Sequence, residues 1–475
     1  LLPNADAFNE TCAAVGNVLF NFRMFLAHQD AKYLDVAEVS LLNNVLAAVN
    51  LEGNRFFYVN PLEADGKYPF NHGTAGRAPW FGTACCPSNM ARLLPQVQGM
   101  TYAHDDKNLY LAMYAQTSTS LQIGGTKLAV SQKTGYPNEG RVEVSLNPEK
   151  PASFTLRLRI PTWTGKQFVP GKLYRYMDKS TAKWSVSVNG KKVAPKTELG
   201  FAVIDRQWRK GDKVLLDLPM PTRLNECDRR VEDNHDRVAF TRGPFVLCAE
   251  EVDNDGATQR FFLNEKPSVG QTKLSKVKHP AGSFIQVVSQ ANALKEAGSP
   301  EKRNLSLIPY YAWNNRKPGS MTIWFPTKPK LAVFDPHKLP KESIFKTIKA
   351  SHTSDLDTLS AIGDGKEPRW SSGKKVPRWT SRPQLGKKQW VEGYFAKPRK
   401  VRDVGVYWMQ DREDVKFPKE WSLEVRKEGK WTPFKLYVTD RYDHRANQYN
   451  VVHPAAPLTC DAIRIKMTPR EEAAA

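Results

Sequence analysis

The sequence has little cysteine and no long apolar run. Six cysteines among 475 residues are too few for a disulfide scaffold, so their number does not indicate a redox compartment. The longest apolar runs, such as residues 45–49, are far shorter than the roughly 20 residues that span a bilayer, and no signal-peptide pattern opens the chain. The sequence therefore predicts a protein without a membrane span.

Acidic side chains are fewer than basic ones. The 49 Asp and Glu residues face 70 Lys and Arg residues, which gives a formal net charge of +21. With 25% charged and 40% hydrophobic residues the composition is nevertheless that of a globular protein, and 475 residues correspond to about three domains. Disorder is therefore excluded as the main state. A nucleic-acid partner is not predicted, because the basic residues are spread along the chain without a nucleic-acid-binding motif.

The first hundred residues have helical patterns. Residues 10–26 are apolar on almost every side and indicate a buried helix, and residues 30–49 indicate a second helix with one apolar and one charged face. The charged face consists of Lys32, Asp35 and Glu38. It predicts an outer, half-exposed helix. A third helix is expected to begin at Pro87, because proline is favoured at the first helical position, and to bend or end at Pro95.

Beyond residue 100 the pattern changes to the alternation typical of strands. Short β-rich runs separated by turns predict β-sandwich domains in residues 101–327. Residues 328–349 are rich in Lys and Pro and indicate a linker. A second set of short strands follows in residues 350–475.

Residues 184–218 contain a more specific signal. Two β-rich runs are interrupted by turn residues at Asn189-Gly190 and at Gly211-Asp212. We expect this segment to form a meander within one sheet.

A glutamate and three cysteines lie in two short motifs near helix starts. Thiolates with one carboxylate are a sound ligand set for tetrahedral zinc. Residues two apart on a helix point about 200° apart, so Glu10 and Cys12 can share an ion only in an extended or turn conformation at the helix entrance. If Pro87 is the first helical residue, Cys86 lies near the N-cap, where the helix dipole favours a thiolate. Buried or disulfide-bonded cysteines, including a Cys85–Cys86 disulfide, are the alternative.

The remaining cysteines and the nearby histidines are not predicted to be ligands. The cysteines in strand-like surroundings are Cys227, Cys248 and Cys460, and we expect them to be small buried hydrophobes. The histidines near the two motifs are His28, His72 and His104. Isolated histidines are more often solvated or packed than bound to metal.

Several separated strings, in the same order, resemble glycoside hydrolase family 127, the β-L-arabinofuranosidase group. The strings are AFNETCAAVGN, FFYVNPLEADGK, ACCPSNMARLLPQ followed by TYAHDDKNLYLAMY, and SLIPYYAWNNRKPGSM. The resemblance implies a multidomain α + β protein, in which residues 1–100 are the C-terminal portion of an (α/α)6 catalytic barrel and residues 101–327 are β-sandwich domains. Residues 350–475 are similar to discoidin-like (coagulation factor 5/8 C-type) modules, which often bind carbohydrate.

The resemblance also assigns the site residues. It implies a Zn²⁺ site built from Glu10, Cys12, Cys85 and Cys86. It makes Cys85 the nucleophile and Tyr58 a residue that contacts the sugar. The implied activity is that of a retaining glycoside hydrolase that releases terminal L-arabinofuranose or a related furanoside from plant-type glycans. The positive net charge is compatible with an acidic, pectin-derived substrate.

Some family elements are expected outside this chain. In the family, the general acid/base glutamate lies shortly upstream of the ETC string and sugar-binding histidines lie further upstream, whereas this chain begins at Leu1, nine residues before Glu10. We expect a longer N-terminal half that completes the barrel, and a periplasmic or extracellular location. A truncated relative that binds zinc without turnover is the other option.

A non-catalytic, zinc-containing polysaccharide-binding protein is the alternative function. In it, the discoidin-like module and the positive charge would hold an acidic polysaccharide. Four tryptophans offer stacking surfaces for sugars, although each is as well suited to a core: Trp370, Trp379, Trp390 and Trp408. Hydrolysis of a small aryl β-L-arabinofuranoside distinguishes the two functions.

Overall fold

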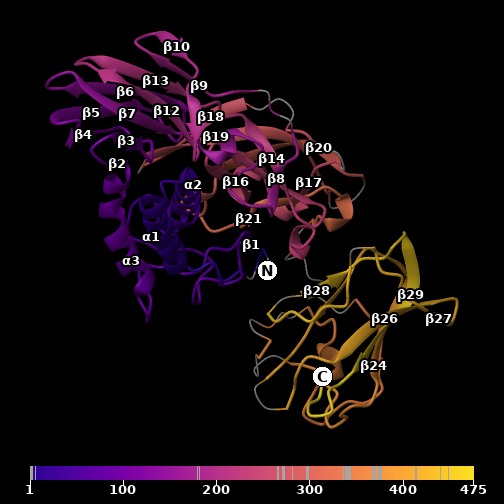
Figure 1. Cartoon of the computed structure of the whole chain (residues 1–475). Helices are drawn as coiled ribbons and strands as arrows, with labels where there is room; N and C mark the ends of the chain where they lie inside the picture. Colours follow the sequence, from indigo (N-terminus) through magenta and orange to yellow (C-terminus); the bar gives the residue numbers. More distant parts are fainter. Residues whose placement is uncertain are drawn as a thin grey trace. The chain divides into compact units, whose positions relative to one another are not determined.

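The computed structural model divides into two compact units, Leu1–Pro336 and His337–Ala475, which we describe separately. It describes residues 4–475 except 6, 179, 181, 265–266, 270–272, 281, 296–298, 335, 337–343, 366–367, 369–370, 373–376, 412–413, 439 and 448. Strands dominate both units (Figure 1). None of the described helices is long and apolar enough to cross a membrane.

The helical segment lies at the start of the first unit. Its elements are α1 (Thr11–His28), α2 (Ala31–Val39), the π-helical turn η1 (Ser40–Val45), α3 (Cys85–Leu93) and the 3-10 segment η2 (Leu94–Met100). Apolar side chains of these elements, such as Val18, Val45 and Met90, form one buried cluster. The helices that the described residues form are too few for an (α/α)6 barrel. The barrel therefore stays a prediction.

Helix α3 begins two residues earlier than the sequence predicts. Its N-cap is Ala84 and its first residue is Cys85, so Pro87 is the third helical residue. Proline is tolerated there because the first four N–H groups of a helix have no intrahelical acceptor. The α-helical part ends at Leu93, and the chain continues past Pro95 as a 3-10 helix. The predicted effect of Pro95 is thus confirmed.

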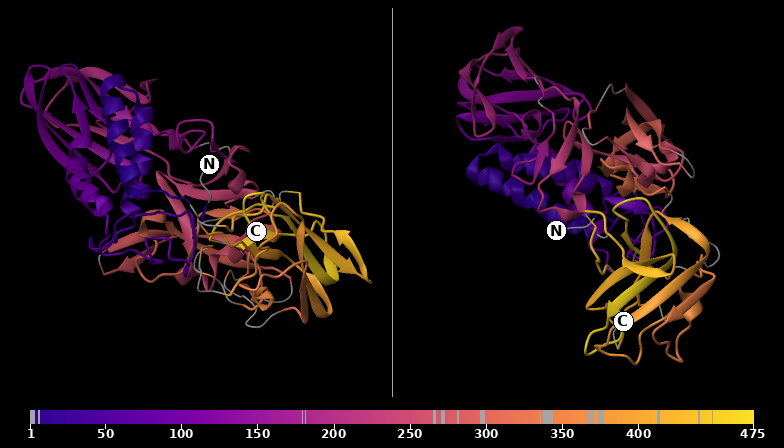
Figure 2. Two further views of the ribbon diagram at one scale, coloured as in Figure 1. Left: turned by 90° about the horizontal axis from the view of Figure 1, so that it is seen from below. Right: turned by 90° about the vertical axis from the view of Figure 1, so that its right-hand side faces the viewer.

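The prediction that the charged side of the second helix faces solvent holds for Lys32, which is exposed, and is wrong for the two carboxylates. Asp35 and Glu38 are 3% and 2% exposed, and both pair with the buried guanidinium of Arg159. Arg159 is the last residue of β7 (Ala152–Arg159). The two carboxylates therefore pack against a strand, and the indigo helices lie beside the purple strands in every view (Figure 1 and Figure 2).

The first β-sandwich is formed by two sheets. One sheet has the order β10 (Lys191–Val193), β9 (Ser185–Val188), β13 (Asp212–Asp217), β6 (Arg141–Pro148), β5 (Thr126–Thr134) and β4 (Thr117–Ile123). The other has the order β11 (Lys196–Glu198), β12 (Phe201–Trp208), β7, β3 (Asn108–Leu111) and β2 (Tyr102–His104). Alternate side chains of β6, including Val142 and Val144, are fully buried between the sheets with Trp208.

The predicted meander is only partly correct. Strands β9 and β10 form a hairpin at Asn189-Gly190, where both residues have positive φ. Strand β12, however, pairs with β7 and β11, whereas β13 pairs with β6 and β9. The turn at Gly211 is therefore an arch between the two sheets. The Asp212 carboxylate stabilises it by accepting the N–H of Arg209 at 2.8 Å.

A larger sheet follows in the same unit. Its main order is β17 (Phe261–Phe262), β19 (Gly282–Ala293), β20 (Glu301–Pro309), β16 (Phe245–Glu250), β15 (Arg237–Arg242), β14 (Thr222–Cys227) and β8 (Tyr174–Tyr176). The strands that join this path are β1 (Glu63–Asp65), β18 (Lys273–His279), β21 (Ser320–Thr322) and β22 (Trp324–Pro326). Because β1 pairs with β21, the segment after Tyr58 is anchored to this sheet.

The second unit is a separate β structure. One sheet has the order β23 (Thr347–Ala350), β24 (Gln389–Val401), β29 (Leu458–Thr468), β26 (Glu420–Lys427) and β27 (Lys430–Pro433), and β25 (Val404–Tyr407) pairs with β28 (Tyr449–Val452). Trp408 lies in its core and Trp379 packs against that core, whereas Trp370 lies outside the described residues. The discoidin-like nature of this unit stays a prediction.

Short helical turns and the predicted linker complete the chain. The turns are η3 (Thr162–Thr164), η4 (Glu232–Asn234), α4 (Glu251–Asn254), η5 (Thr258–Arg260), η6 (Tyr310–Ala312), η7 (Pro329–Leu331) and η8 (Leu359–Ala361). The predicted linker, residues 328–349, is described mainly at its ends, where η7 and the start of β23 lie. Cys248 and Cys460 are buried as predicted, and Cys227 is half-buried.

Candidate metal centre

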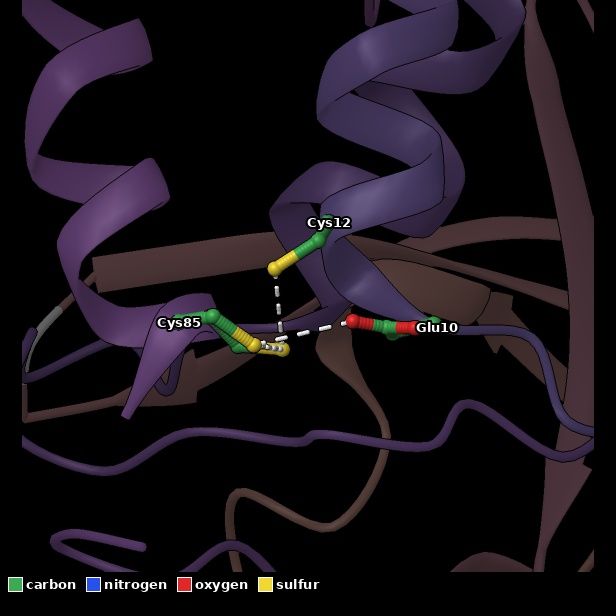
Figure 3. A group of neighbouring side chains, drawn as sticks. Glu10, Cys12 and Cys85 are labelled. Atoms are coloured by element: carbon green, nitrogen blue, oxygen red, sulfur yellow. Dashed lines mark hydrogen bonds between the residues drawn. The ribbon is translucent and has the colours of Figure 1, made fainter. Parts of the chain in front are cut away.

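Four side chains from the two short motifs converge at one point. They are Glu10, Cys12, Cys85 and Cys86, here called the thiol cluster, and one ligand atom from each lies within 4.8 Å of all the others. Figure 3 shows Glu10, Cys12 and Cys85 pointing toward one another. The Cys12 and Cys86 sulfurs are 3.5 Å apart, the Cys85 and Cys86 sulfurs 3.9 Å, and the Cys85 sulfur is 3.6 Å from Glu10 Oε1.

The sulfur atoms of the thiol cluster are not joined to each other. A disulfide bond is about 2.05 Å long, whereas the shortest sulfur–sulfur distance in the cluster is 3.5 Å. All six cysteines of the chain, each of which the structure describes, are free thiols. The disulfide alternative, including a Cys85–Cys86 bond, is therefore wrong.

Two helix starts bring these residues together. Glu10 is the N-cap of α1 with extended backbone (φ −67°, ψ 134°), and Cys12 is the second helical residue. This is the extended helix entrance that the sequence requires for the two residues to share an ion. Cys85 and Cys86 are the first two residues of α3. The first N–H groups of a helix have no acceptor within the helix, and the positive end of the helix dipole at both starts favours negative charge on the sulfurs.

The start of α1 is held by the segment that carries Tyr58. Thr11 donates its N–H to the Tyr58 carbonyl at 3.1 Å and its hydroxyl to the Phe57 carbonyl at 2.8 Å. The buried Asn60 amide donates to Thr11 Oγ1 and to the Asn9 carbonyl, both at 3.0 Å. These bonds fix the backbone on both sides of Glu10 and so direct its carboxylate.

Tyr58 lies directly beside the thiol cluster. Its hydroxyl is 3.3 Å from the Cys85 sulfur. Its ring contacts three other rings, with centroid distances of 4.3 Å to His72, 5.5 Å to Phe81 and 6.0 Å to Phe8. The sequence prediction that Tyr58 belongs to the site is thus compatible with its position, and its contact with a sugar stays a prediction.

The loop that carries His72 has an unusual backbone conformation, which hydrogen bonds stabilise. His72 has a φ of 49°, in the left-handed region, where a non-glycine residue is uncommon. The fully buried Asn71 side chain accepts the Tyr58 N–H at 2.7 Å and donates to the carbonyls of Phe56 at 3.1 Å and Gly76 at 2.9 Å. The loop thereby places the imidazole on the Tyr58 ring. The sequence does not predict His72 as a site residue. The sequence feature that could have drawn attention to it is the Asn71-His72-Gly73 turn.

Asn89 is a second residue that sequence reasoning missed. It lies on α3, four residues after Cys85, and its side-chain N–H donates to the Cys12 sulfur at 3.2 Å. The four-residue spacing puts Asn89 on the same helix face as Cys85. This spacing is the sequence feature that could have identified Asn89 as a neighbour of the thiol cluster.

Burial and hydrogen bonds shift the pKa values of the Cys12 and Cys86 thiols and of the Tyr58 hydroxyl when no metal is bound. Burial raises the pKa of the Cys12 thiol and, more strongly, that of the Cys86 thiol. The hydrogen bond with Cys85 raises the pKa of the Tyr58 hydroxyl. Without a cation, Cys12 and Cys86 therefore hold their protons at neutral pH. A cation among the sulfurs opposes that effect, because it favours the thiolate form.

The donor set fits a metal ion. Three thiols and one carboxylate supply four ligand atoms, the number used in closed tetrahedral sites. Cys86 is fully buried, whereas Glu10, Cys12 and Cys85 are half-buried. The thiol cluster could therefore hold one ion with only part of the site open to solvent.

Comparison with known proteins gives the family of the chain. Three models of one family match consecutive parts of the chain: the β-L-arabinofuranosidase GH127 catalytic domain (residues 1–99), the GH127 middle domain (residues 108–220) and the glycoside hydrolase family 127 C-terminal domain (residues 222–326). The thiol cluster lies within the part that matches the catalytic domain.

Individual relatives match over about two thirds of this chain. The non-reducing end β-L-arabinofuranosidase of Bifidobacterium longum subsp. longum is 29% identical over 343 residues, which are 68% of this chain and 50% of that protein. A solved GH127 β-arabinofuranosidase is 39% identical with a TM-score of 0.65, covering 70% of this chain and 51% of that one. A GH127 β-L-arabinofuranosidase from Geobacillus stearothermophilus T6 is 33% identical with a TM-score of 0.61, covering 69% and 51%.

The chain spans about half the length of these relatives. The family matches nevertheless follow one another from residue 1 to residue 326 and include the residues of the thiol cluster. On this basis the chain belongs to glycoside hydrolase family 127.

Proposed function

We propose that this chain supplies the cysteine nucleophile of a retaining glycoside hydrolase that releases terminal L-arabinofuranose or a related furanoside from plant-type glycans. The observation that carries the proposal is the convergence of the thiol cluster within the part that matches the catalytic domain. The names of its relatives, β-L-arabinofuranosidases, support the substrate class. Because such glycans lie outside cells, we place the activity in the periplasm or the extracellular space.

We propose zinc as the ion of the thiol cluster. Cysteine thiolates with one carboxylate suit the tetrahedral, borderline-soft Zn²⁺ ion better than hard cations such as Mg²⁺ or Ca²⁺. Bound zinc would keep the Cys85 sulfur ionised at neutral pH, where a free thiol is mostly protonated. Glu10, Cys12 and Cys86 would hold the ion and take no part in bond formation with the sugar.

We propose Cys85 as the sulfur that attacks the sugar. Cys86 is fully buried, whereas Cys85 is half-buried and lies beside the Tyr58 hydroxyl. In the first step the Cys85 sulfur donates its electron pair to the anomeric carbon. A carbon–sulfur bond forms, and the carbon–oxygen bond breaks with its electrons leaving on the aglycone oxygen, which takes a proton from a general acid. In the second step a water oxygen bonds to the anomeric carbon and gives one proton to the conjugate base of the general acid. The carbon–sulfur bond breaks, and its electrons return to the Cys85 sulfur as a thiolate.

The Tyr58 hydroxyl is placed to serve both partners of this reaction. At 3.3 Å from the Cys85 sulfur it can donate a hydrogen bond to the thiolate. The same hydroxyl can donate to a sugar oxygen once the sugar covers the site. The His72 and Phe81 rings, which contact the Tyr58 ring, limit its movement during this exchange.

The test is to trap the glycosylated cysteine. The zinc-loaded full chain is incubated with 2,4-dinitrophenyl β-L-arabinofuranoside, whose leaving group departs without a proton, and is then digested and analysed by mass spectrometry. We expect an anhydropentose adduct on Cys85, no adduct in Cys85→Ala, and a normal adduct in the control Cys227→Ala, a half-buried cysteine outside the thiol cluster.

Two outcomes would count against the proposal. An adduct on a different residue would disprove the assignment of the nucleophile. A zinc-loaded chain that forms no adduct but binds an acidic polysaccharide would support the non-catalytic alternative.

A further inference from the structure

We propose that the side-chain amide of Asn89 is a positioning group of the metal centre, which holds the Cys12 sulfur in place as a ligand and thereby sets how tightly the ion is retained. The inference rests on the proposed function, in which the thiol cluster binds one metal ion. It goes further by assigning a role to a residue that supplies no ligand atom. Asn89 neither attacks the sugar nor binds the metal in this account.

The contact itself joins two different helices. Asn89 lies on α3 (Cys85–Leu93), and its Nδ2 donates to Sγ of Cys12, on α1 (Thr11–His28), at 3.2 Å. Helix α3 also carries Cys85 and Cys86. The amide therefore ties the ligand of one helix to the helix that supplies the other two sulfurs.

The strength of this bond depends on the charge of the sulfur. A neutral thiol is a weak hydrogen-bond acceptor, whereas hydrogen bonds to an ionised acceptor are about twice as strong as neutral ones. The contact is thus most favourable when Cys12 is a thiolate, which is the state that binds metal. An amide N–H at this position favours the metal-bound form over the empty form.

The three sulfurs of the thiol cluster differ in their surroundings. Cys12 receives the amide of Asn89. Cys86 is fully buried and lies 3.5 Å and 3.9 Å from the other two sulfurs. Cys85 lies beside the Tyr58 hydroxyl and the Glu10 carboxylate. The amide is therefore directed at a sulfur that holds the ion in the proposed function, and not at the Cys85 sulfur that attacks the sugar.

The expected loss of metal affinity can be estimated from other groups that orient metal ligands by hydrogen bonds. Loss of such an outer hydrogen bond commonly weakens metal binding 10- to 100-fold. We expect a loss of about this size when Asn89 loses its donor. The turnover of enzyme saturated with metal should change far less, because Cys85 and Tyr58 are untouched.

The experiment compares three variants of the full chain in competition with a chromophoric chelator for Zn²⁺. Asn89→Leu keeps the approximate shape of the side chain but cannot donate, and Asn89→Ala removes both shape and donor. Gln96→Ala is the matched control, because Gln96 is an exposed amide that donates to the Arg92 carbonyl in the adjoining turn. We expect Asn89→Leu and Asn89→Ala to bind Zn²⁺ about 10- to 100-fold more weakly and Gln96→Ala to bind normally.

A spectroscopic readout separates a donor from a merely structural side chain. In the Co²⁺-loaded chain, a hydrogen bond to a thiolate lowers the energy of its lone pair and so moves the sulfur-to-cobalt charge-transfer band to higher energy. Asn89→Leu should move that band to lower energy, and Gln96→Ala should leave it unchanged. Wild-type affinity and an unshifted band in Asn89→Leu would overturn the role of Asn89 alone. A wild-type chain that binds neither ion would overturn the proposed metal site and this inference together.

Discussion

Replacement of Arg159 by methionine should loosen helix α2 from the first sandwich. The guanidinium is fully buried, donates to Asp35 Oδ1 at 2.7 Å and to the Ala112 carbonyl at 2.7 Å, and pairs with Glu38. In Arg159→Met the two carboxylates stay buried without their cation. Removing one partner of a buried ion pair costs about 3–5 kcal/mol, because the remaining charge is left uncompensated.

Hydrogen exchange of α2 measures this loss directly. At about 1.4 kcal/mol for each factor of ten, the opening constant of the helix should rise by at least on the order of a hundredfold. Peptides covering Ala31–Val39, analysed by mass spectrometry, report that opening without requiring the whole chain to unfold in one step. The expected result is a large increase in exchange in these peptides.

The same strand offers a matched control. Arg157 pairs with Glu198 at 3.2 Å, but the two side chains are 20% and 39% exposed. Such a pair contributes about 0–1 kcal/mol, so Arg157→Met should leave exchange in α2 almost unchanged. If Arg159→Met also leaves α2 exchange unchanged, the buried network does not hold the helix, and the reasoning is refuted.

Three other predictions concern the site and the domain organisation. Tyr58→Phe removes the hydroxyl 3.3 Å from the Cys85 sulfur, so turnover should fall about 10-fold or more while metal content stays normal; normal turnover would exclude a role for the hydroxyl. Because burial raises the pKa of Cys12 and Cys86 above the ordinary thiol value, zinc must displace protons, and affinity should rise with pH through the neutral range. Calorimetry in buffers of different ionisation enthalpy should then detect proton release, and pH-independent binding without release would contradict thiolate ligation. Residues 337–475 form a compact unit and should unfold cooperatively when expressed alone; a non-cooperative transition would show that the unit depends on the rest of the chain.

Local patterns in the sequence are sufficient to predict several structural elements. Alternation of Val142 and Val144 with polar neighbours predicts the buried face of β6, and Asn189-Gly190 predicts the hairpin between β9 and β10. The geometry of a helix start was also predictable, because Glu10 and Cys12 could meet only if Glu10 was extended. In each case the deciding interactions lie within a few residues along the chain.

Interactions between distant segments account for the errors. The spacing of Asp35 and Glu38 fits a solvent face. Their burial is made favourable by partners far along the chain, chiefly the cation of Arg159, more than a hundred residues away. The sequence around Gly211 predicts a meander, whereas the structure has an arch, because the alternation of side chains is the same whichever sheet a strand joins. Proline does not fix the first residue of helix α3, because it is acceptable anywhere in the first turn, and the helix starts at Cys85.

The candidate site could be assembled from motifs but not from spacing alone. The ligand residues come from the family resemblance, and the structure adds their mutual distances. Asn89 lies within the string ACCPSNMARLLPQ, but the resemblance gives it no role, and His72 lies outside the quoted strings. Their contacts with Cys12 and Tyr58 depend on how α3 and the loop after Asn71 pack against α1, which no local pattern specifies.

The most direct test of the central claim is zinc K-edge X-ray absorption on the full chain loaded with zinc. We predict one zinc per chain, with three sulfur neighbours at about 2.3 Å and one oxygen neighbour at about 2.0–2.2 Å. Replacement of Cys12 by alanine should remove one sulfur from that shell. A coordination shell without sulfur, or a chain that binds no zinc while its thiols are reduced, would contradict the claim.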